Sequence, residues 1–416
     1  MLRSDLGSLR SAGASLDAAD PLAGLRDSFH LPAGKIYLDG NSLGVLPKGA
    51  EARVLAMLRQ EWGENLIASW NTAGWFVKPQ VVGDRIGRLI GAQPGEVIAL
   101  DSTSLNIFKV VCAALRLRPD RRVFVSESSN FPTDIYMLQG IRDLLGDIEI
   151  RIATPQTPLE TLLDGAGVVL LTHVDFRSGA FHDMAAVTAK VQAAGALMIW
   201  DLAHSAGALE VDLTTANADF AVGCGYKYLN GGPGAPAFVY CPKRHQAQVR
   251  QPLTGWLGHS DPFAFTLEYA PDTGIRSFQC GTPPILSYAA LEASLDVWEQ
   301  TSMAAVRAKS VALTRHFIAC VDTFAAQHGL TLATPRDDHV RGSQVSWSHP
   351  EGFRIMKALI SRGVVGDFRA PDILRFGFTP LYTSFDDVWR AADVLLDIME
   401  TGDWQRFAKD RDGPTT

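Results

Sequence analysis

Apolar runs alternate with helical periodicity through the middle of the chain, from Glu96 onward. A continuous apolar run such as Val168–Leu171 is typical of a strand that is buried on both faces. Alternation of such runs with helical segments favours a mostly parallel sheet covered by helices, so we predict an α/β fold. The expected strands are Val97–Leu100, Val123–Val125, Val168–Leu171, Ala196–Trp200, Phe220–Val222 and Ala237–Tyr240.

A second region begins after Pro283 and Pro284, which interrupt this pattern. A long helical pattern follows from Leu286 to about Ala326, with a break near Thr301. The rest has the pattern of a smaller α/β domain, in which a capping box is expected before the last helix. The expected elements are strands at Gln344–Trp347 and Ile373–Phe378, helices at Phe353–Arg362 and Val388–Met399, and the capping box at Ser384–Asp387.

The N-terminal region has a weaker pattern. Residues 1–30 are mixed in polarity and predict a helix or arm, followed by a short strand at Lys35–Asp39 and a turn at Gly40–Gly44. Helical periodicity returns at Ala50–Trp62 and at Val81–Ile90. We therefore predict an arm at 1–35 that joins the small domain, a large domain at 36–290, a small C-terminal domain at 291–416, and a mobile tail at Asp410–Thr416.

Composition narrows the class of protein. The net charge of −7 argues against a nucleic-acid surface, which would need a basic stripe. No apolar run reaches membrane-spanning length, and residues 1–31 lack the features of a signal peptide. The five cysteines are scattered without metal-like spacing, which favours free thiols in a reducing cytoplasm. We expect a cytoplasmic protein that binds neither membrane, nucleic acid nor metal.

Two residues at expected strand ends carry the most informative chemistry. Asp201 directly follows the apolar run Ala196–Trp200, and Lys227 follows the run Phe220–Val222. A carboxylate can bind a protonated ring nitrogen, and a lysine can form an imine with an aldehyde; pyridoxal phosphate needs both groups. Ligands of open α/β sheets bind beyond the carboxyl ends of strands, where both residues are expected. The pair predicts a pyridoxal-phosphate site.

Other residues could complete such a site. Asp101–Ser104 lies between a strand and a helix, where amide N–H groups and hydroxyls can bind a phosphate dianion. Tyr226 is a further candidate donor, and His204 could pack near the cofactor ring. Arg375 lies among apolar residues of an expected strand and needs a partner if buried. A substrate carboxylate that accepts two hydrogen bonds from the guanidinium would be such a partner.

Each of these residues also has an ordinary structural interpretation. Lys227 could lie on the surface, Asp201 could cap a turn, and His204 and Arg375 could be structural. Serine and threonine cap helix starts in any protein. The cluster Asn230–Gly234 favours the functional interpretation of the lysine, because glycines allow the backbone to approach a ligand closely.

Together these motifs resemble the pyridoxal-phosphate enzymes of the aspartate-aminotransferase fold, fold type I, and within their class V branch the kynureninase family. The resemblance implies a large domain with a mostly parallel seven-stranded sheet sandwiched by helices, a smaller C-terminal α/β domain, and a homodimer with sites at the subunit interface. The segments that carry it span most of the chain: Gly40–Gly44, Phe131–Asp134, Asp201–His204, Tyr226–Asn230, Gly255–His259 and Pro380–Phe385.

The resemblance also implies residue roles. Lys227 would hold the cofactor covalently, Asp201 would bind its ring nitrogen, and Tyr226 would act in catalysis. Trp256 and Thr282 would reach in from a second subunit; some relatives carry asparagine in place of Thr282, which puts the preferred ring substituent in doubt. The other implied cofactor contacts are Thr103, Ser104, Phe131, Asp134, Thr172 and His204, and the implied substrate contacts are Arg375, Asn41, Ser42 and Trp70.

The activity implied by the resemblance is hydrolysis of L-kynurenine, or of its 3-hydroxy form, in tryptophan catabolism and NAD biosynthesis. A class V aminotransferase or a cysteine desulfurase is the alternative enzyme. Desulfurases usually place serine and histidine ahead of the lysine and need a reactive cysteine, and no cysteine here stands out. A cofactor-binding regulatory protein would need a DNA-binding segment, and none is evident.

Overall fold

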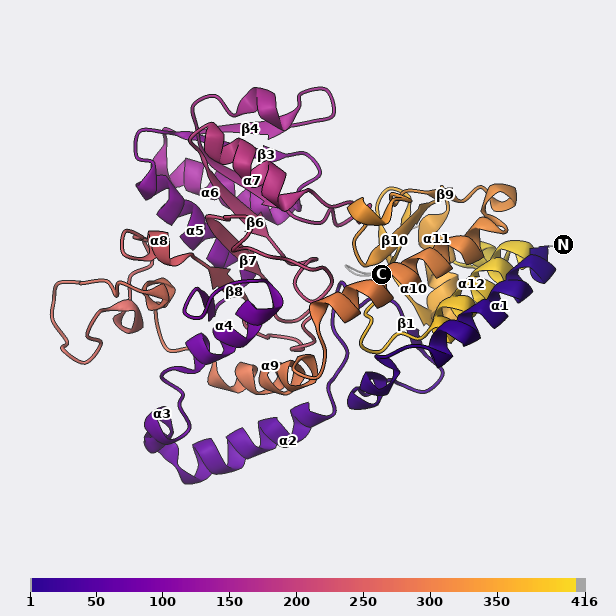
Figure 1. Cartoon of the computed structure of the whole chain (residues 1–416), viewed down its shortest axis with the longest axis horizontal. Helices are drawn as coiled ribbons and strands as arrows, with labels where there is room; N and C mark the ends of the chain where they lie inside the picture. The colour runs from indigo at the N-terminus through magenta and orange to yellow at the C-terminus, as the bar shows by residue number, and fades with distance from the viewer. Residues whose placement is uncertain (1, 409–416) are drawn as a thin grey trace.

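The computed structural model describes residues 2–408, so the tail Asp410–Thr416 lies outside the described part of the chain. Two lobes are visible in Figure 1, one built around a seven-stranded sheet and the other around a four-stranded sheet. Helix α1 (Leu2–Ala18) packs on the second lobe, against α12 (Phe385–Thr401). The domain bounds expected from the sequence stay predictions.

The seven-stranded sheet has the strand order β2-β8-β7-β6-β5-β3-β4. Neighbouring strands from β7 to β4 are parallel, whereas β8 runs antiparallel to both β2 and β7. The predicted mostly parallel sheet is therefore confirmed, with β8 as its exception. The strands are β2 (Val97–Ala99), β3 (Val123–Glu127), β4 (Glu149–Ala153), β5 (Ala166–Thr172), β6 (Leu197–Asp201), β7 (Phe220–Gly223) and β8 (Phe238–Tyr240).

Helices cover both faces of this sheet. Two of them, α5 and α6, share a buried cluster with one face, and three others, α4, α7 and α9, share a cluster with the opposite face. The predicted sandwich of helices around the sheet is confirmed. The helices are α4 (Lys78–Leu89), α5 (Thr103–Leu117), α6 (Pro132–Leu145), α7 (Met184–Ala193) and α9 (Ile285–Trp298).

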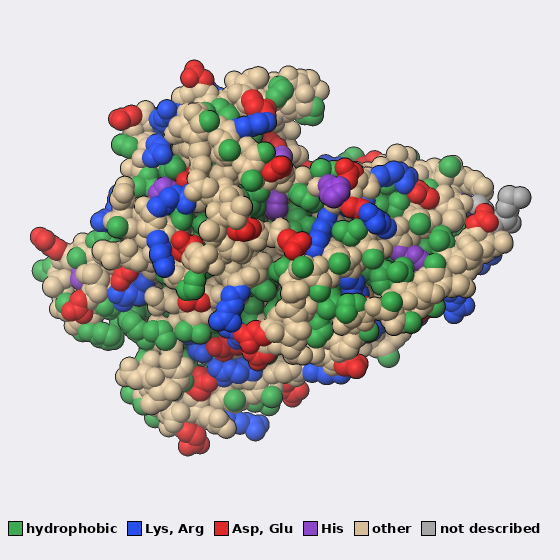
Figure 2. Space-filling model, in the orientation of Figure 1, with side chains coloured by type: hydrophobic (Ala, Val, Ile, Leu, Met, Phe, Trp, Pro, Cys, Tyr) green, Lys and Arg blue, Asp and Glu red, His purple; other side chains and the backbone are tan. Residues whose placement is uncertain are grey.

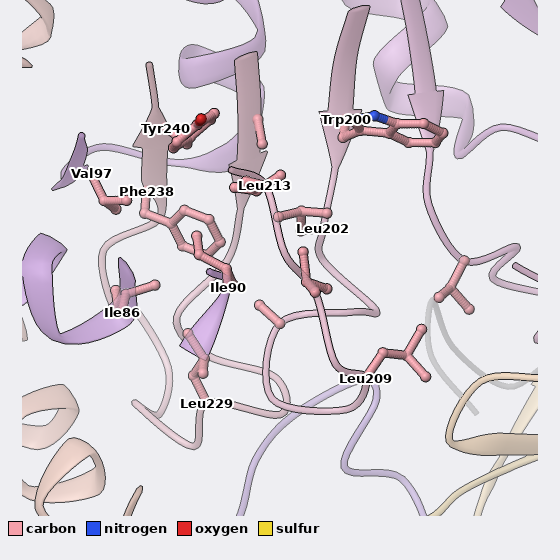
Figure 3. Close-up of a cluster of buried hydrophobic side chains, with 14 of the residues drawn as sticks. Ile86, Ile90, Val97, Trp200, Leu202, Leu209, Leu213, Leu229, Phe238 and Tyr240 are labelled. Carbon is pink, nitrogen blue, oxygen red and sulfur yellow. The ribbon is translucent and has the colours of Figure 1, made fainter. Parts of the chain in front are cut away.

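Strand β5 shows why a central strand is apolar throughout. Val168 and Leu170 belong to the cluster with α5 and α6, whereas Val169 and Leu171 belong to the cluster with α4, α7 and α9. Successive side chains point to opposite faces, and here both faces are buried. Thr172, the last residue of β5, points to the same face of the sheet as Val168 and Leu170, which is the face covered by α5 and α6. Figure 3 shows part of the other cluster, with Ile86, Ile90, Val97, Trp200 and Phe238 among its members.

The second lobe contains the antiparallel sheet β12-β13-β10-β9, with α10 and α11 packed against it and α12 packed against those two helices. A parallel pair, β1 and β11, brings the chain near residue 36 into the same buried cluster. The elements are β1 (Ile36–Tyr37), β9 (Thr331–Leu332), β10 (Gln344–Ser348), β11 (Val364–Val365), β12 (Asp367–Arg369), β13 (Ile373–Gly377), α10 (Met303–Asp322) and α11 (Gly352–Ser361).

Short helices make up much of the remainder. Helix α2 continues as the π-helical segment η2, so the helix predicted at Ala50–Trp62 changes its hydrogen-bonding pattern after Ala56. These elements are α2 (Gly49–Ala56), α3 (Ser69–Thr72), α8 (Lys243–Gln246), η1 (Ala23–Ser28), η2 (Met57–Glu64), η3 (Leu66–Ala68), η4 (Leu159–Leu162), η5 (Trp256–Gly258), η6 (Ile275–Phe278), η7 (Ala325–His328), η8 (Asp338–Val340) and η9 (Asp403–Arg406).

Helix ends follow the sequence closely. The predicted break near Thr301 separates α9 from α10, and Ser302 caps α10 by accepting from the N–H of Ala305. The predicted capping box is present, because Ser384 and Asp387 bond to each other's backbone N–H groups. Strand β4 was not expected, because it lies at the edge of its sheet, is partly exposed and lacks a long apolar run.

Three findings bear on the class of protein. Within residues 2–408, no helix combines the length and apolarity that crossing a membrane requires. The five cysteines are free thiols. In the same described range, His, Cys, Asp and Glu side chains form no group of three or more that could hold a metal ion.

Candidate active site

A pocket lies beyond the carboxyl ends of β5 and β6, where α5 and α6 begin. It brings together nine of the residues expected at a cofactor site, and it adds residues that the sequence did not single out. The expected residues are Thr103, Ser104, Phe131, Asp134, Thr172, Asp201, His204, Tyr226 and Lys227. The additional lining residues are Ile107, Thr133, Phe176 and Ala203.

Asp201 is the last residue of β6, beside Thr172 of β5 and Val222 of β7 in register. Its side chain is buried, and its Oδ1 accepts a hydrogen bond from the N–H of Ala203 at 2.8 Å. Burial raises the pKa of the Asp201 carboxyl, while the charge of Lys227 and the Ala203 N–H oppose that rise. A cation placed beside Asp201 would therefore stabilise its ionised form.

Lys227 follows β7 and is held by a close backbone contact. The Gly44 N–H donates to the carbonyl of Tyr226 at 2.8 Å, and a Cβ at Gly44 would lie 2.4 Å from the Lys227 carbonyl. Only glycine fits there, which gives the predicted turn Gly40–Gly44 a structural role. The Lys227 Nζ lies 5.8 Å from the ring centroids of both Phe131 and Tyr226, and it makes no hydrogen bond within the described chain.

A carboxyl group in the pocket wall, Asp134, and an amide group outside it, Asn130, lie close to Thr172. Asn130 accepts from the N–H of Thr172 at 2.6 Å, and Thr172 Oγ1 accepts from the N–H of Phe131 at 3.3 Å. Asp134 is almost fully buried, and burial together with the charge of Asp201 raises the pKa of Asp134 well above its ordinary value. Asn130 was not predicted, because nothing in the sequence marks an asparagine that supports a neighbouring strand end.

His204 is buried, and its Nδ1 has no hydrogen-bond partner among residues 2–408. Burial lowers the pKa of His204 well below its ordinary value, and the charge of Lys227 lowers it further. The imidazole is therefore neutral. A neutral ring with an unsatisfied nitrogen at the wall of the pocket is available to a polar group of a ligand.

The start of α5 forms the other end of the pocket. Ser102 is the N-cap and accepts from the N–H of Leu105 at 3.4 Å, and Thr103 and Ser104 are the first helical residues. The first N–H groups of a helix have no partner within it, and the helix dipole favours an anion there. A helix start of this kind can bind a phosphate, and the predicted phosphate contacts of Thr103 and Ser104 stay predictions.

Arg375 lies in β13, directly opposite Asp367 of β12 in register. Both side chains are buried and form an ion pair, and Ser42 bonds to both. Asn41 is also buried here and packs against Gly377, where a Cβ would collide with it. The structure thus places three of the predicted substrate contacts in one cluster, beside Phe176 of the pocket.

Asp367 and Arg369 are functional candidates that the sequence analysis missed. Strand β12 has three residues and no apolar run, so its pairing with β13 was not foreseen. The sequence did contain one indication of this pairing, namely an acidic residue before the turn at Pro371 and a basic residue after it. Opposite charges often pair across neighbouring strands.

Three predicted residues lie outside both the pocket and the cluster around Arg375. Trp70 and Thr282 line an apolar pocket of their own with Trp62 and Trp75, and Trp256 lines a third pocket beside η5. Within one chain these residues do not meet Lys227. The role predicted for Trp256 and Thr282, to act from a second subunit, stays a prediction.

Comparison with solved structures defines the class of fold. A cysteine desulfurase from Thermococcus onnurineus superimposes with a TM-score of 0.76 at 19% identity, covering 91% of this chain and 98% of that one. A C-DES variant with glycine covalently linked to its PLP cofactor superimposes with a TM-score of 0.72 at 18% identity, covering 89% and 98%. The chain has the fold of these class V enzymes, as expected.

Sequence comparison defines the family. Residues 306–395 match the model of the kynureninase C-terminal domain. A kynureninase from Burkholderia pseudomallei is 56% identical over 402 residues, which cover 95% of this chain and 97% of the relative. The chain belongs to the kynureninase family.

Proposed function

We propose that this protein is a pyridoxal-phosphate enzyme that hydrolyses L-kynurenine to anthranilate and L-alanine. The single observation that carries the proposal is the meeting of Asp201, Lys227 and the α5 helix start in one pocket. Family membership supports the choice of reaction, because 56% identity extends over almost the whole chain.

The residues present fit the cofactor. Lys227 Nζ and His204 Nδ1 are polar groups without hydrogen-bond partners in the described chain, and both face the pocket. Asp201 uses one oxygen for Ala203, and its other oxygen accepts no hydrogen bond from residues 2–408. Lys227 would hold the cofactor covalently, Asp201 would bind its ring nitrogen, Phe131 would stack on the ring, and Thr103, Ser104 and Tyr226 would bind the phosphate.

When bound, pyridoxal phosphate supplies an electron sink for bonds made and broken at the substrate's Cα and Cβ. Asp201 would keep a proton on the ring nitrogen, which strengthens that sink. Lys227 Nζ would take the proton from the substrate's Cα and act as a general base. The phenol of Tyr226 would carry protons during attack of water on the γ-carbonyl; burial raises its pKa, so it holds its proton at neutral pH.

We further propose a homodimer whose interface completes the site. Exposed apolar residues gather on the loop between η5 and η6, and Figure 2 shows apolar side chains along that edge of the molecule. Phe263, Phe265 and Leu267 are 62%, 77% and 105% exposed, which is unusual for a monomer. A second copy would cover them and bring Trp256 and Thr282 to the site, and the Trp70 pocket would stack the aniline ring. Sedimentation would give the oligomeric state.

The free cysteines support the cytoplasm as the location, and kynurenine hydrolysis would place the enzyme in tryptophan catabolism leading toward NAD. Incubation with L-kynurenine and with its 3-hydroxy form, followed by fluorescence of the anthranilate product, tests the proposal directly. We expect anthranilate and L-alanine without any keto-acid cosubstrate. A requirement for a keto acid would indicate an aminotransferase instead, and sulfide release from cysteine would indicate a desulfurase.

A further inference from the structure

The guanidinium group of Arg375 has few donors left for a substrate. Its Nε donates to Oδ1 of Asp367 at 2.7 Å, and its Nη2 donates to the other oxygen of Asp367 and to Ser42 Oγ at 2.9 Å. Its Nη1 donates to the carbonyl of Phe176 at 2.7 Å. A guanidinium carries five N–H donors, so one N–H on Nη1 remains. A carboxylate that needs two parallel contacts must find its second donor elsewhere.

Arg369 is the neighbouring group with free donors. Its Nη2 donates to Asp367 and, at 3.5 Å, lies against Ser42 Oγ. Its Nε is buried without a hydrogen-bond partner, and its Nη1 makes no hydrogen bond within the described residues. The Arg369 side chain is 37% exposed, whereas that of Arg375 is 1% exposed. Arg369 can therefore meet a ligand with the two N–H groups of Nη1, for which no acceptor is found among the described residues.

Arg369 is linked to the cofactor pocket through Ser42 and Arg375, because Arg375 Nη1 donates to the carbonyl of Phe176, a residue of the pocket wall. Burial lowers the pKa of His204, and the charges of Lys227, Arg375 and Arg369 lower it further, so both guanidiniums lie near that ring. Burial raises the pKa of Tyr226, and the charge of Arg369 opposes this rise. His204 and Tyr226 both line the pocket with Lys227. An amine near Lys227 and a carboxylate near Arg369 are thus compatible with one amino-acid ligand.

The charge of the cluster favours an anion. Burial alone would raise the pKa of Asp367, but the charges and hydrogen bonds of Arg375 and Arg369 outweigh it and lower the pKa. Asp367 is therefore ionised and shared by two cations, which leaves one positive charge in excess. Asp39, the other carboxyl nearby, has a pKa raised to about 7 by burial and by Asp367, so it does not cancel that charge in mildly acidic solution.

We propose that Arg369 and Arg375 bind the substrate's α-carboxylate together, with Arg369 supplying the larger share of the contact and Asp367 positioning both guanidiniums. The proposal rests on the proposed function, because it assumes that an α-amino acid occupies this pocket. It assigns to Arg369 a role in selecting α-amino acids over amines of the same side chain. In this arrangement Asp367 stays in place when the ligand arrives.

The test compares L-kynurenine with its decarboxylated amine on the holoenzyme. Arg369→Gln should raise the KM and the dissociation constant of L-kynurenine about tenfold, change kcat less than about threefold, and leave binding of the amine unchanged. Arg369→Lys keeps the positive charge and the ion pair but lacks the paired N–H donors of a guanidinium. A smaller loss of L-kynurenine affinity, again without an effect on the amine, is therefore expected. Arg362→Gln is the matched control, because Arg362 is 33% exposed and pairs with Asp397 away from the site.

The possible results distinguish the role of Arg369 from the proposed function. Equal losses for L-kynurenine and the amine, or no loss in either Arg369 variant, would overturn the role of Arg369 while leaving the proposed function intact. Absence of anthranilate from the wild-type enzyme would overturn the proposed function and, with it, this assignment. A selective loss in both Arg369 variants, with Arg362→Gln like the wild type, would support it.

Discussion

The cofactor pocket and the arginine cluster beside it are built in opposite ways. In the pocket, Lys227 Nζ and His204 Nδ1 have no hydrogen-bond partners among the described residues. In the cluster, Asp367, Ser42 and the Phe176 carbonyl take up nearly all donors of Arg375. A resident cofactor can satisfy groups that the protein leaves open, whereas a site that is empty between turnovers must be stable by itself. An internal carboxylate gives the cluster that stability.

The largest effect is expected when Lys227 is removed from the pocket. Lys227→Ala should lower kcat by about 10²–10⁴-fold or more and abolish the visible absorbance of the covalently held cofactor, because no other amine can replace the Nζ group. The thermal stability of the cofactor-free protein should change little, since Lys227 Nζ makes no hydrogen bond within residues 2–408. Absorbance spectra and thermal unfolding check both points, and a retained visible band would remove Lys227 from this role.

In the arginine cluster, by contrast, a substitution should lower the stability of the cofactor-free protein. Arg375→Ala leaves the buried carboxylate of Asp367 with Arg369, whose side chain is 37% exposed, as its remaining partner. Complete loss of the partner of a buried charge costs about 3–5 kcal/mol of folding free energy, so a cost below that range is expected here. Denaturant unfolding of the cofactor-free protein measures this cost. Substrate binding should weaken as well, more for L-kynurenine than for its decarboxylated amine.

A double variant separates the two effects of Arg375. Replacing Asp367 as well, in Arg375→Ala with Asp367→Ala, removes the buried carboxylate that then has only Arg369 as a partner, and it should restore part of the lost stability without restoring substrate affinity. If the double variant unfolds as easily as the single one, the ion pair is not the source of stability in the cluster, and its contrast with the cofactor pocket does not hold.

The same contrast explains what the sequence could predict. Asp201 and Lys227 each follow an apolar strand, and strand ends are visible in a hydrophobic pattern. The role of Asp367 could not be predicted, because it depends on the position of Asp367 opposite Arg375 in a hairpin. The first strand of that hairpin has only three residues, too few to show a hydrophobic pattern. Trp256 and Thr282 were named through resemblance alone, and one chain does not bring them to Lys227. Local pattern thus predicted the α/β class, the two strand-end residues and the helix start. The resemblance supplied other pocket residues such as Phe131, Asp134 and Thr172, and pairing between distant strands decided the rest.

A smaller effect is expected at the ring-nitrogen partner. Asp201→Asn keeps an oxygen that can accept from the Ala203 N–H, so the fold and the substrate's KM should change little. The amide cannot hold a proton on the cofactor ring, so kcat should fall by about 10²-fold. Steady-state kinetics with L-kynurenine measure both constants. An unchanged kcat would count against contact between Asp201 and the ring nitrogen.

The smallest effect concerns Asp39, which links the cluster to pH. Burial and the charge of Asp367 raise the pKa of Asp39 to about 7 from an ordinary 3.8. A carboxyl whose pKa is raised by folding contributes stability that is complete below pH 3.8 and lost as pH rises through about 7. Asp39→Asn cannot ionise, so it should be more stable than the wild type above pH 7 and differ least in acid. The groups that face Asp39 are Tyr37, Tyr228, Tyr382, Asp367, Arg369 and Arg375.

Ionisation of Asp39 should also weaken substrate binding. Its negative charge would reduce the attraction of Arg369 and Arg375 for an incoming carboxylate, so the wild-type KM for L-kynurenine should rise about threefold to tenfold between about pH 6 and about pH 8. In Asp39→Asn the ratio of KM values at the two pH values should be closer to one, while the decarboxylated amine should show no such difference between the proteins. The same rise in variant and wild type would assign it to another group, and Asp39 would then matter only for stability.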